Sequence, residues 1–189
     1  MSYITYIKNK KTKAKFISFF SALIILGLVV MPALVLADNS DIQKVSEVRL
    51  KISEIGVDAV IKNMGVTSDG AMAVPNNNID VGWFSFGARP GETGTAVIGA
   101  HNRLNSKPGI FARLDELKKG DTLSVVNSSG TSIYFVVRDI HTYDALDTNT
   151  GVFESSGSGT HLNLITCSGA WDSKTKSHTT RLVIFTDLV

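Results

Sequence analysis

The only cysteine of the chain, Cys167, is the side chain with the clearest chemical potential. It directly follows the alternating run 161–166 and precedes Ser168-Gly169, so we expect it at a strand end that faces a loop. The thiolate form of cysteine is the nucleophile, and a free thiol has a pKa of about 8.5, so a nearby positive charge or base would activate it. The alternative is a structural cysteine that closes a strand.

A histidine is the natural partner of such a thiol, because its side chain exchanges protons near neutral pH. Of the four histidines, His101 ends the apolar run 95–100 and is followed by polar residues, the same strand-end setting as Cys167. His141 lies within a long predicted strand, whereas His161 and His178 are predicted to be solvated. The sequence therefore favours His101 as the proton carrier.

Arg181 is the third candidate, fourteen residues beyond Cys167 at the start of the last predicted strand. If that strand pairs beside the Cys167 strand, the intervening loop returns Arg181 to the same end. A guanidinium stays protonated and offers a fixed fork of donors, which suits a thiolate, a developing oxyanion or a substrate carbonyl. An exposed cation at a strand edge is the simpler interpretation of the same position.

The elements that must position these residues are mostly short strands, separated by Gly, Asn, Asp and Ser. One hairpin turn is predicted at 127–130, and one or two short amphipathic helical turns at 110–117. Two long polar loops are predicted at 142–160 and 168–180. About eight strands with one or two short helices indicate a β-barrel or sandwich. The strands are expected at 48–52, 57–61, 71–74, 95–100, 122–126, 133–140, 161–166 and 181–185.

The N-terminus differs in composition from the rest of the chain. Residues 1–37 contain five lysines and no acidic residue, and 16–37 contain no charge at all. Twenty-two uncharged, mostly apolar residues are enough to cross a hydrocarbon core of about 30 Å as a helix, and the preceding lysines favour a cytoplasmic N-terminus. Ala37 also offers a possible cleavage point for a signal peptide, although signal peptides have shorter apolar regions.

The predicted organisation is therefore a basic cytoplasmic segment, a transmembrane signal anchor, a linker and an extracytoplasmic domain in the cell membrane. Their expected bounds are 1–15, 16–37, 38–47 and 48–189. Subtracting the five lysines of residues 1–37 from 19 basic residues leaves 14 against 17 acidic ones, a net charge of −3. This balance argues against a nucleic-acid partner. One cysteine also excludes a disulfide within the chain, so an extracytoplasmic thiol needs another reason to exist.

Several segments, in their order along the chain, resemble the sortase family of cysteine transpeptidases. Leu164-Ile165-Thr166-Cys167 is similar to the end of the T-L-x-T-C signature, and an arginine follows about a dozen residues later. Residues 89–101 resemble the segment that carries the family's histidine, and 110–121 resemble its next helix and turn. Asn163 stands where the signature has its first threonine, which points to a divergent subclass, of the class D, E or F kind rather than class A or B.

The resemblance implies an eight-stranded sortase-type β-barrel and a specific reaction. Cys167 would attack an LPXTG-like sorting signal between Thr and Gly, Arg181 would stabilise the oxyanion, and His101 would protonate the leaving amine. A cell-wall precursor or a pilin lysine would then open the thioacyl-enzyme with its amine. The partners implied are thus proteins with C-terminal sorting signals and an amine acceptor.

The same resemblance suggests where the sorting signal binds. Thr166 would help to position the substrate or its oxyanion near Cys167. The loop 142–160 would shape the pocket for the Leu and Pro of the signal. Its apolar members are Ala145, Leu146, Val152 and Phe153. We expect no cofactor and no metal site, since Asp144 and Asp147 are more simply solvated loop charges.

Two other classes of function remain open from the sequence. One is a different secreted cysteine enzyme, such as an L,D-transpeptidase or a papain-like hydrolase, although the cysteine signatures of those families are missing. The other is a membrane-tethered binding domain with a catalytically silent sortase fold. The presence of Cys167, His101 and Arg181 argues against loss of activity.

Overall fold

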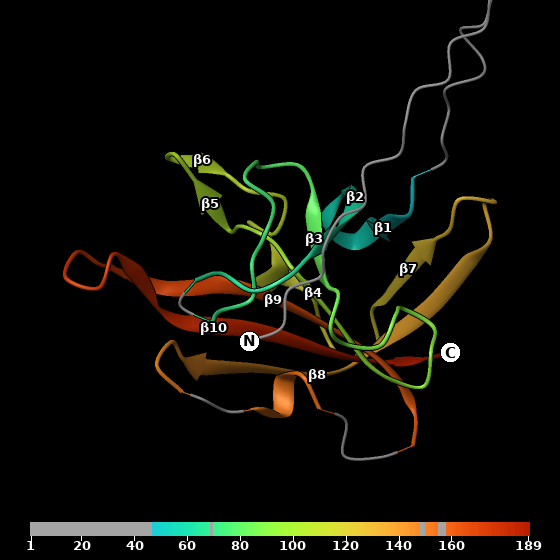
Figure 1. Cartoon of the computed structure of the whole chain (residues 1–189). Helices are drawn as coiled ribbons and strands as arrows, with labels where there is room; N and C mark the ends of the chain where they lie inside the picture. Colours follow the sequence, from blue (N-terminus) through green and yellow to red (C-terminus); the bar gives the residue numbers. More distant parts are fainter. Residues whose placement is uncertain (1–46, 69, 148–149, 155–157) are drawn as a thin grey trace, which may run out of the picture. The chain divides into compact units, whose positions relative to one another are not determined.

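A computed structural model describes residues 47–189, apart from 69, 148–149 and 155–157 (Figure 1). The predicted segments 1–15 and 16–37, and all but the end of the linker 38–47, lie outside the described residues. Within the described part, no helix is both long and apolar enough to cross a membrane.

Eight strands close into a barrel in the order β1-β2-β3-β4-β9-β10-β8-β7, which confirms the predicted architecture. Two further short strands, β5 and β6, pair only with each other (Figure 1). The strands are β1 Arg49–Ile52, β2 Val57–Met64, β3 Val81–Phe84, β4 Gly94–Gly99, β5 Arg103–Leu104, β6 Lys107–Pro108, β7 Thr122–Val126, β8 Ser132–Asp144, β9 Thr160–Asp172 and β10 Ser177–Leu188.

Successive residues of each barrel strand point alternately to the inner and the outer face of the barrel. In β1, Leu50 and Ile52 are buried while the residues before each are half-buried. In β4 and β9 both faces are covered, because a second, smaller apolar cluster packs on the outside. The inner cluster includes residues of β4, β9 and β10, namely Ala96, Ile98, Leu162, Leu164, Leu182 and Ile184. The outer cluster is built on Val97, Val152, Val183 and Phe185.

The predicted turn at 127–130 is confirmed, and the side chain of Asn127 explains it. Its Oδ1 accepts hydrogen bonds from the backbone N–H of Ser129 at 3.0 Å and of Thr131 at 2.9 Å. Gly130 adopts a φ of 85°, the left-handed region that glycine reaches without strain. The turn joins β7 to β8 with the register that the two apolar patterns require.

The strands that carry Cys167 and Arg181 are longer than predicted. The segment 168–180 was expected to be a loop, but β9 runs to Asp172 and β10 begins at Ser177, so most of it is an extended hairpin. The register of this hairpin shifts between His178 and Thr180, next to Gly169 at a φ of 75°. Its Ser and Thr residues gave no hydrophobic alternation, because both faces of the extension are largely in solvent.

Two further differences from the sequence prediction concern local structure. Residues 71–74 form no strand, and only an isolated bridge joins Val66 to Met72. The strand β3 was not predicted, since it is four residues long and apolar without alternation. The segment 110–117 forms short helical turns, as predicted, and these are of the 3₁₀ type, with Leu117 N–H bonded to Leu114 O. The short 3₁₀ helices are η2 Ser53–Ile55, η3 Leu114–Glu116 and η4 Thr150–Val152.

The buried side chain of Asn163 ties the loop between β8 and β9 to the barrel. Asn163, only 2% exposed on β9, donates from Nδ2 to the backbone oxygen of Val152 at 2.7 Å. Val152 is itself buried in the outer apolar cluster. This bond therefore fixes the loop just before Phe153.

Replacing Asn163 with Asp should destabilise the protein by about 1–3 kcal/mol at neutral pH, because a carboxylate cannot donate to the buried Val152 oxygen. Urea unfolding followed by fluorescence measures the change. The control is Asn127→Asp, where only the oxygen of the side chain is used, and it should shift the free energy of unfolding by less than about 0.5 kcal/mol. Equal effects of the two substitutions would contradict this role of Asn163.

Candidate active site

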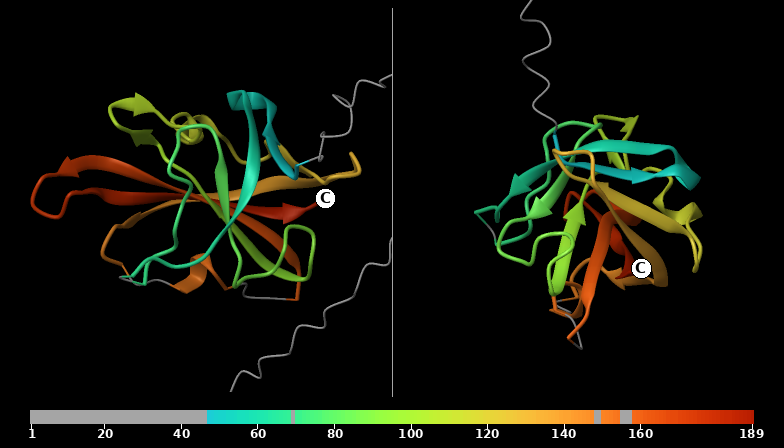
Figure 2. Two further views of the ribbon diagram at one scale, coloured as in Figure 1. Left: turned by 45° about the horizontal axis from the view of Figure 1, so that its top comes forward. Right: turned by 90° about the vertical axis from the view of Figure 1, so that its right-hand side faces the viewer.

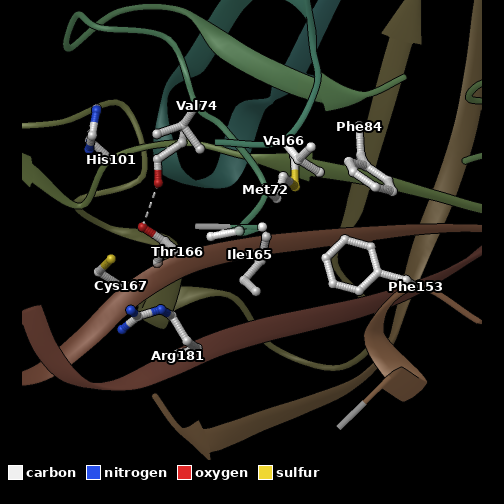
Figure 3. Close-up of a pocket in the computed structure, with 13 residues that line it drawn as sticks. Val66, Met72, Val74, Phe84, His101, Phe153, Ile165, Thr166, Cys167 and Arg181 are labelled. Carbon is white, nitrogen blue, oxygen red and sulfur yellow. Dashed lines mark hydrogen bonds between the residues drawn. The ribbon is translucent and has the colours of Figure 1, made fainter. Parts of the chain in front are cut away.

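A cavity of about 540 Å³ opens over the outer face of β9 and β10 (Figure 3). Four of the residues that line it have polar or reactive side chains, and the others are apolar or glycine. The four are His101, Thr166, Cys167 and Arg181. The structure thus brings all three predicted catalytic residues to one cavity.

Cys167 and Arg181 meet because their strands pair directly. They are opposite one another in the antiparallel ladder of β9 and β10. Directly opposed residues present their side chains on the same face of a sheet. Since Leu164, Thr166 and Leu182 are buried on the inner side, Cys167 and Arg181 lie on the outer face, where the half-buried thiol reaches the cavity.

His101 reaches the same face from β4, two residues after the strand ends at Gly99. β4 runs parallel to β9, with Gly99 beside Ile165. The inner-facing hydroxyl of Thr166 donates to the backbone oxygen of Ala100 at 2.8 Å, and Ala100 is buried in the core of the barrel. This bond locks the residue before His101 to the residue before Cys167.

A close backbone contact holds His101 from its other side. The N–H of Phe111 donates to the backbone oxygen of His101 at 3.1 Å, and that of Gly109 to Asn102 at 2.7 Å. A Cβ atom at Gly109 would overlap the backbone oxygen of His101. Only glycine therefore lets this segment approach His101 so closely.

The guanidinium of Arg181 is oriented by neutral oxygen atoms. Nη1 donates to the backbone oxygens of His178 at 3.0 Å and Thr180 at 2.9 Å, and Nη2 donates to Ser177 Oγ at 3.0 Å. Among the described residues, no carboxylate forms an ion pair with Arg181. Its charge is therefore available to a group in the cavity, and in the view of Figure 3 its guanidinium and the ring of His101 lie on opposite sides of the Cys167 sulfur.

The far end of the cavity is apolar. Phe84 of β3 and Phe153 of the β8–β9 loop pack edge to face with ring centroids 5.1 Å apart. Val66, Met72 and Val74 add a second wall (Figure 3). This wall was missed in the sequence, where the apolar run 71–74 indicated a strand although it lines a binding surface.

Of the five residues predicted to bind the sorting signal, two line the cavity. Phe153 contributes to the apolar end and Thr166 lies next to Cys167. Val152 is buried in the outer cluster, Leu146 is 82% exposed, and Ala145 donates its N–H to Thr179 O. These three do not line the cavity.

Two of the other histidines are placed differently from the prediction. His161 was expected to be solvated, but its side chain is only 18% exposed and its Nδ1 lies 2.8 Å from Asp187 Oδ1. His178 belongs to β10 rather than a loop, and its Nδ1 donates to Gly169 O at 3.0 Å. His141 lies in β8, as predicted, with Nε2 3.0 Å from Asp139 Oδ2.

Asp144, the last residue of β8, has a local role. Its Oδ1 accepts a hydrogen bond from the N–H of Leu146 at 2.9 Å. In the part of the chain that the structure describes, no three His, Cys, Asp or Glu side chains are grouped to hold a metal ion.

Comparison with known proteins identifies the family and the fold of the chain. The sequence model of the Sortase domain matches residues 50–189. No curated protein sequence matches the chain. The fold is similar to that of a Sortase D5 transpeptidase of Clostridium perfringens, with 22% identity, a TM-score of 0.57, and coverage of 76% of this chain and 78% of that one.

Two further solved structures have the same fold. Sortase C-1 of Actinomyces oris matches with 22% identity and a TM-score of 0.58, covering 75% of this chain and 73% of that one. A lid mutant of Sortase A from Corynebacterium diphtheriae matches with 21% identity and a TM-score of 0.58, covering 76% of this chain and 69% of that one. Sortases of several classes are thus about equally similar, and because the family match covers most of the chain, the protein belongs to the sortase family of cysteine transpeptidases.

Proposed function

We propose that this chain cleaves an LPXTG-like sorting signal between Thr and Gly, holds the product as a thioacyl-enzyme on Cys167, and transfers it to an amine. The observation that carries the proposal is the convergence of Cys167, His101 and Arg181 on one cavity with an apolar end. That cavity offers a nucleophile, a proton carrier and an oxyanion partner beside a surface for apolar side chains.

In the first half-reaction, the thiolate of Cys167 attacks the carbonyl carbon of the Thr–Gly bond. The carbonyl oxygen becomes an oxyanion, which the free side of the Arg181 guanidinium stabilises. The C–N bond then breaks, the leaving amine takes a proton from the imidazolium of His101, and a thioester to Cys167 remains.

The apolar end of the cavity suits the N-terminal part of the signal. Phe84, Phe153 and Met72 would contact its Leu and Pro, while the Thr–Gly bond lies over Cys167. An extended peptide bound in this direction keeps its acyl half on the apolar side after cleavage. The leaving half then departs past His101.

In the second half-reaction, an amine attacks the carbonyl carbon of the thioester. The amine gives a proton to the neutral imidazole of His101, the C–S bond breaks, and the thiolate of Cys167 returns. A new peptide bond joins the sorted protein to its acceptor. We propose a peptidoglycan precursor or a pilin lysine as the source of that amine.

We further propose that residues 16–37 anchor the enzyme in the cell membrane and that the catalytic domain is extracytoplasmic. The lysine-rich segment 1–15 supports this orientation. There the enzyme would meet its substrate proteins and its acceptor at the same membrane surface.

The proposed function leads to three predictions, and the first concerns the covalent intermediate. The full-length chain in detergent micelles, incubated with an LPXTG-type peptide, should gain the mass of the acyl fragment, and Cys167→Ala should not. Intact-protein mass spectrometry measures the adduct. If the wild-type chain forms no adduct, or if the Ala variant forms it too, the proposed chemistry is wrong.

The second prediction concerns Arg181. Replacing it with Ala should lower kcat for peptide cleavage by about 10²–10³-fold, because one preorganised oxyanion donor is lost. The matched control is Arg49→Ala, which removes a half-buried guanidinium that pairs with Asp58 far from Cys167 in the fold. Steady-state assays with a quenched fluorescent peptide compare the two, and a near-normal kcat for Arg181→Ala would assign the residue to the scaffold.

The third prediction concerns the backbone under His101. Gly109→Ala should lower kcat by about tenfold to a hundredfold, because the new methyl group displaces the backbone of His101 and misplaces the imidazole. The control is Gly65→Ala, where the added Cβ meets only Phe86 at 3.8 Å. Both variants are assayed with the same peptide, and equal rates would show that His101 tolerates the shift.

A further inference from the structure

A second cavity adjoins the reactive pair on the side opposite the apolar cavity. Its volume is about 460 Å³, and it shares His101 and Cys167 with the first cavity. The rest of its lining comes from the β5–β6 hairpin and from the outer part of the β9–β10 hairpin. These residues are Asn102, Arg103, Leu104, Asn105, Ser106, Trp171, Lys176, Ser177 and His178. We call this second cavity the hairpin groove.

The two hairpins project from the same side of the barrel, as both Figure 1 and Figure 2 show. The strands β9 and β10 extend past Cys167 and Arg181 to Asp172 and Ser177, so one wall of the groove is a continuation of the catalytic strands. The other wall follows directly from His101 through Asn102 and Arg103. The groove therefore begins at the reacting atoms and leads away from the apolar cavity.

The lining of the groove is cationic. Of the described residues that line it, Arg103 and Lys176 are cationic and none is acidic. The two segments that form the hairpins, 102–108 and 168–180, contain four Lys or Arg residues and one Asp. Residues 38–189 as a whole carry a net charge of −3, from 14 basic and 17 acidic residues. A positive groove on a negative domain indicates an anionic ligand.

The one acidic residue, Asp172, is engaged inside the hairpin turn. Its Oδ1 accepts the backbone N–H of Lys174 at 2.9 Å, and its Oδ2 accepts the hydroxyl of Thr175 at 3.0 Å. The bond from Lys174 N–H, together with that from Thr175, holds the pKa of Asp172 below its usual range. Both carboxylate oxygens of Asp172 are thus used within the turn, and neither pairs with the ammonium group of Lys176.

Trp171 gives the groove an aromatic wall. Its side chain is 60% exposed and packs edge to face with His178, with ring centroids 5.5 Å apart. His178 donates from Nδ1 to Gly169 O, which fixes the ring against the hairpin. A large exposed aromatic side chain offers an apolar surface on which the backbone of an extended ligand can pack.

We propose that the hairpin groove binds the acceptor and selects an amine that carries an anionic group nearby, a carboxylate or a phosphate. This inference rests on the proposed function, since it names the acceptor of the same reaction. The amine lies over the thioester of Cys167 near His101, and the anionic group lies between Arg103 and Lys176. The acyl donor occupies the apolar cavity, so the two substrates approach the sulfur from opposite sides.

The test compares three acceptors with the same N-terminal amine, Gly-Gly-Glu amide, Gly-Gly-phosphoserine amide and Gly-Gly-Gln amide. They compete for the thioacyl form of the full-length enzyme, and mass spectrometry measures the product ratios. At low salt, at least one charged acceptor should be preferred over the Gln acceptor by about three- to tenfold, and the preferred one identifies carboxylate or phosphate. High salt should reduce the preference.

A double variant, Arg103→Gln with Lys176→Gln, should bring the product ratio close to one. The control variant Lys118→Gln, outside the groove, should keep the wild-type ratio. Because each ratio is measured within one protein preparation, a loss of folded enzyme cancels. A ratio near one in the wild type, or an unchanged ratio in the double variant, would overturn the acceptor site. Absence of the thioacyl form would instead overturn the proposed function.

Discussion

The pairing of β9 with β10 is the constraint on which the active site depends. Cys167 faces Arg181 across this ladder, and both reach the outer face because the alternate residues Leu164 and Leu182 are held in the core. A shift of one residue would place Cys167 inside the barrel and Thr166 outside. The same β9 pairs in parallel with β4, so the register that sets the thiol also sets the approach of His101.

Two cavities on opposite sides of Cys167 would give the proposed reaction a direction. The apolar cavity would hold the acyl half through both half-reactions, whereas the hairpin groove would be vacated by one amine and entered by another. His101 lines both cavities and is therefore placed to give a proton to the first amine and take one from the second. The hairpin groove exists because β9 and β10 extend beyond the barrel.

Much of this arrangement could be predicted from the sequence, because it depends on local patterns. The inner-facing residues of β1 and β7 alternate with more exposed ones, and His101 and Cys167 each follow an apolar run. The extended hairpin 168–180 could not be predicted, since its strands are held by a bulged backbone ladder rather than by burial. Residues 71–74 were assigned to a strand because an apolar run has the same composition whether it pairs or lines a cavity.

Asn163 illustrates how one strand organises the whole acyl side. On the outer face of β9, Asn163 holds the β8–β9 loop just before Phe153, Ile165 forms part of the cavity, and Cys167 is the proposed nucleophile. These residues are two apart, so their spacing along the strand is fixed by the backbone. A threonine has no amide donor at its tip to make this bond to Val152. The departure from the signature therefore ties the apolar wall to the same ladder that positions the thiol.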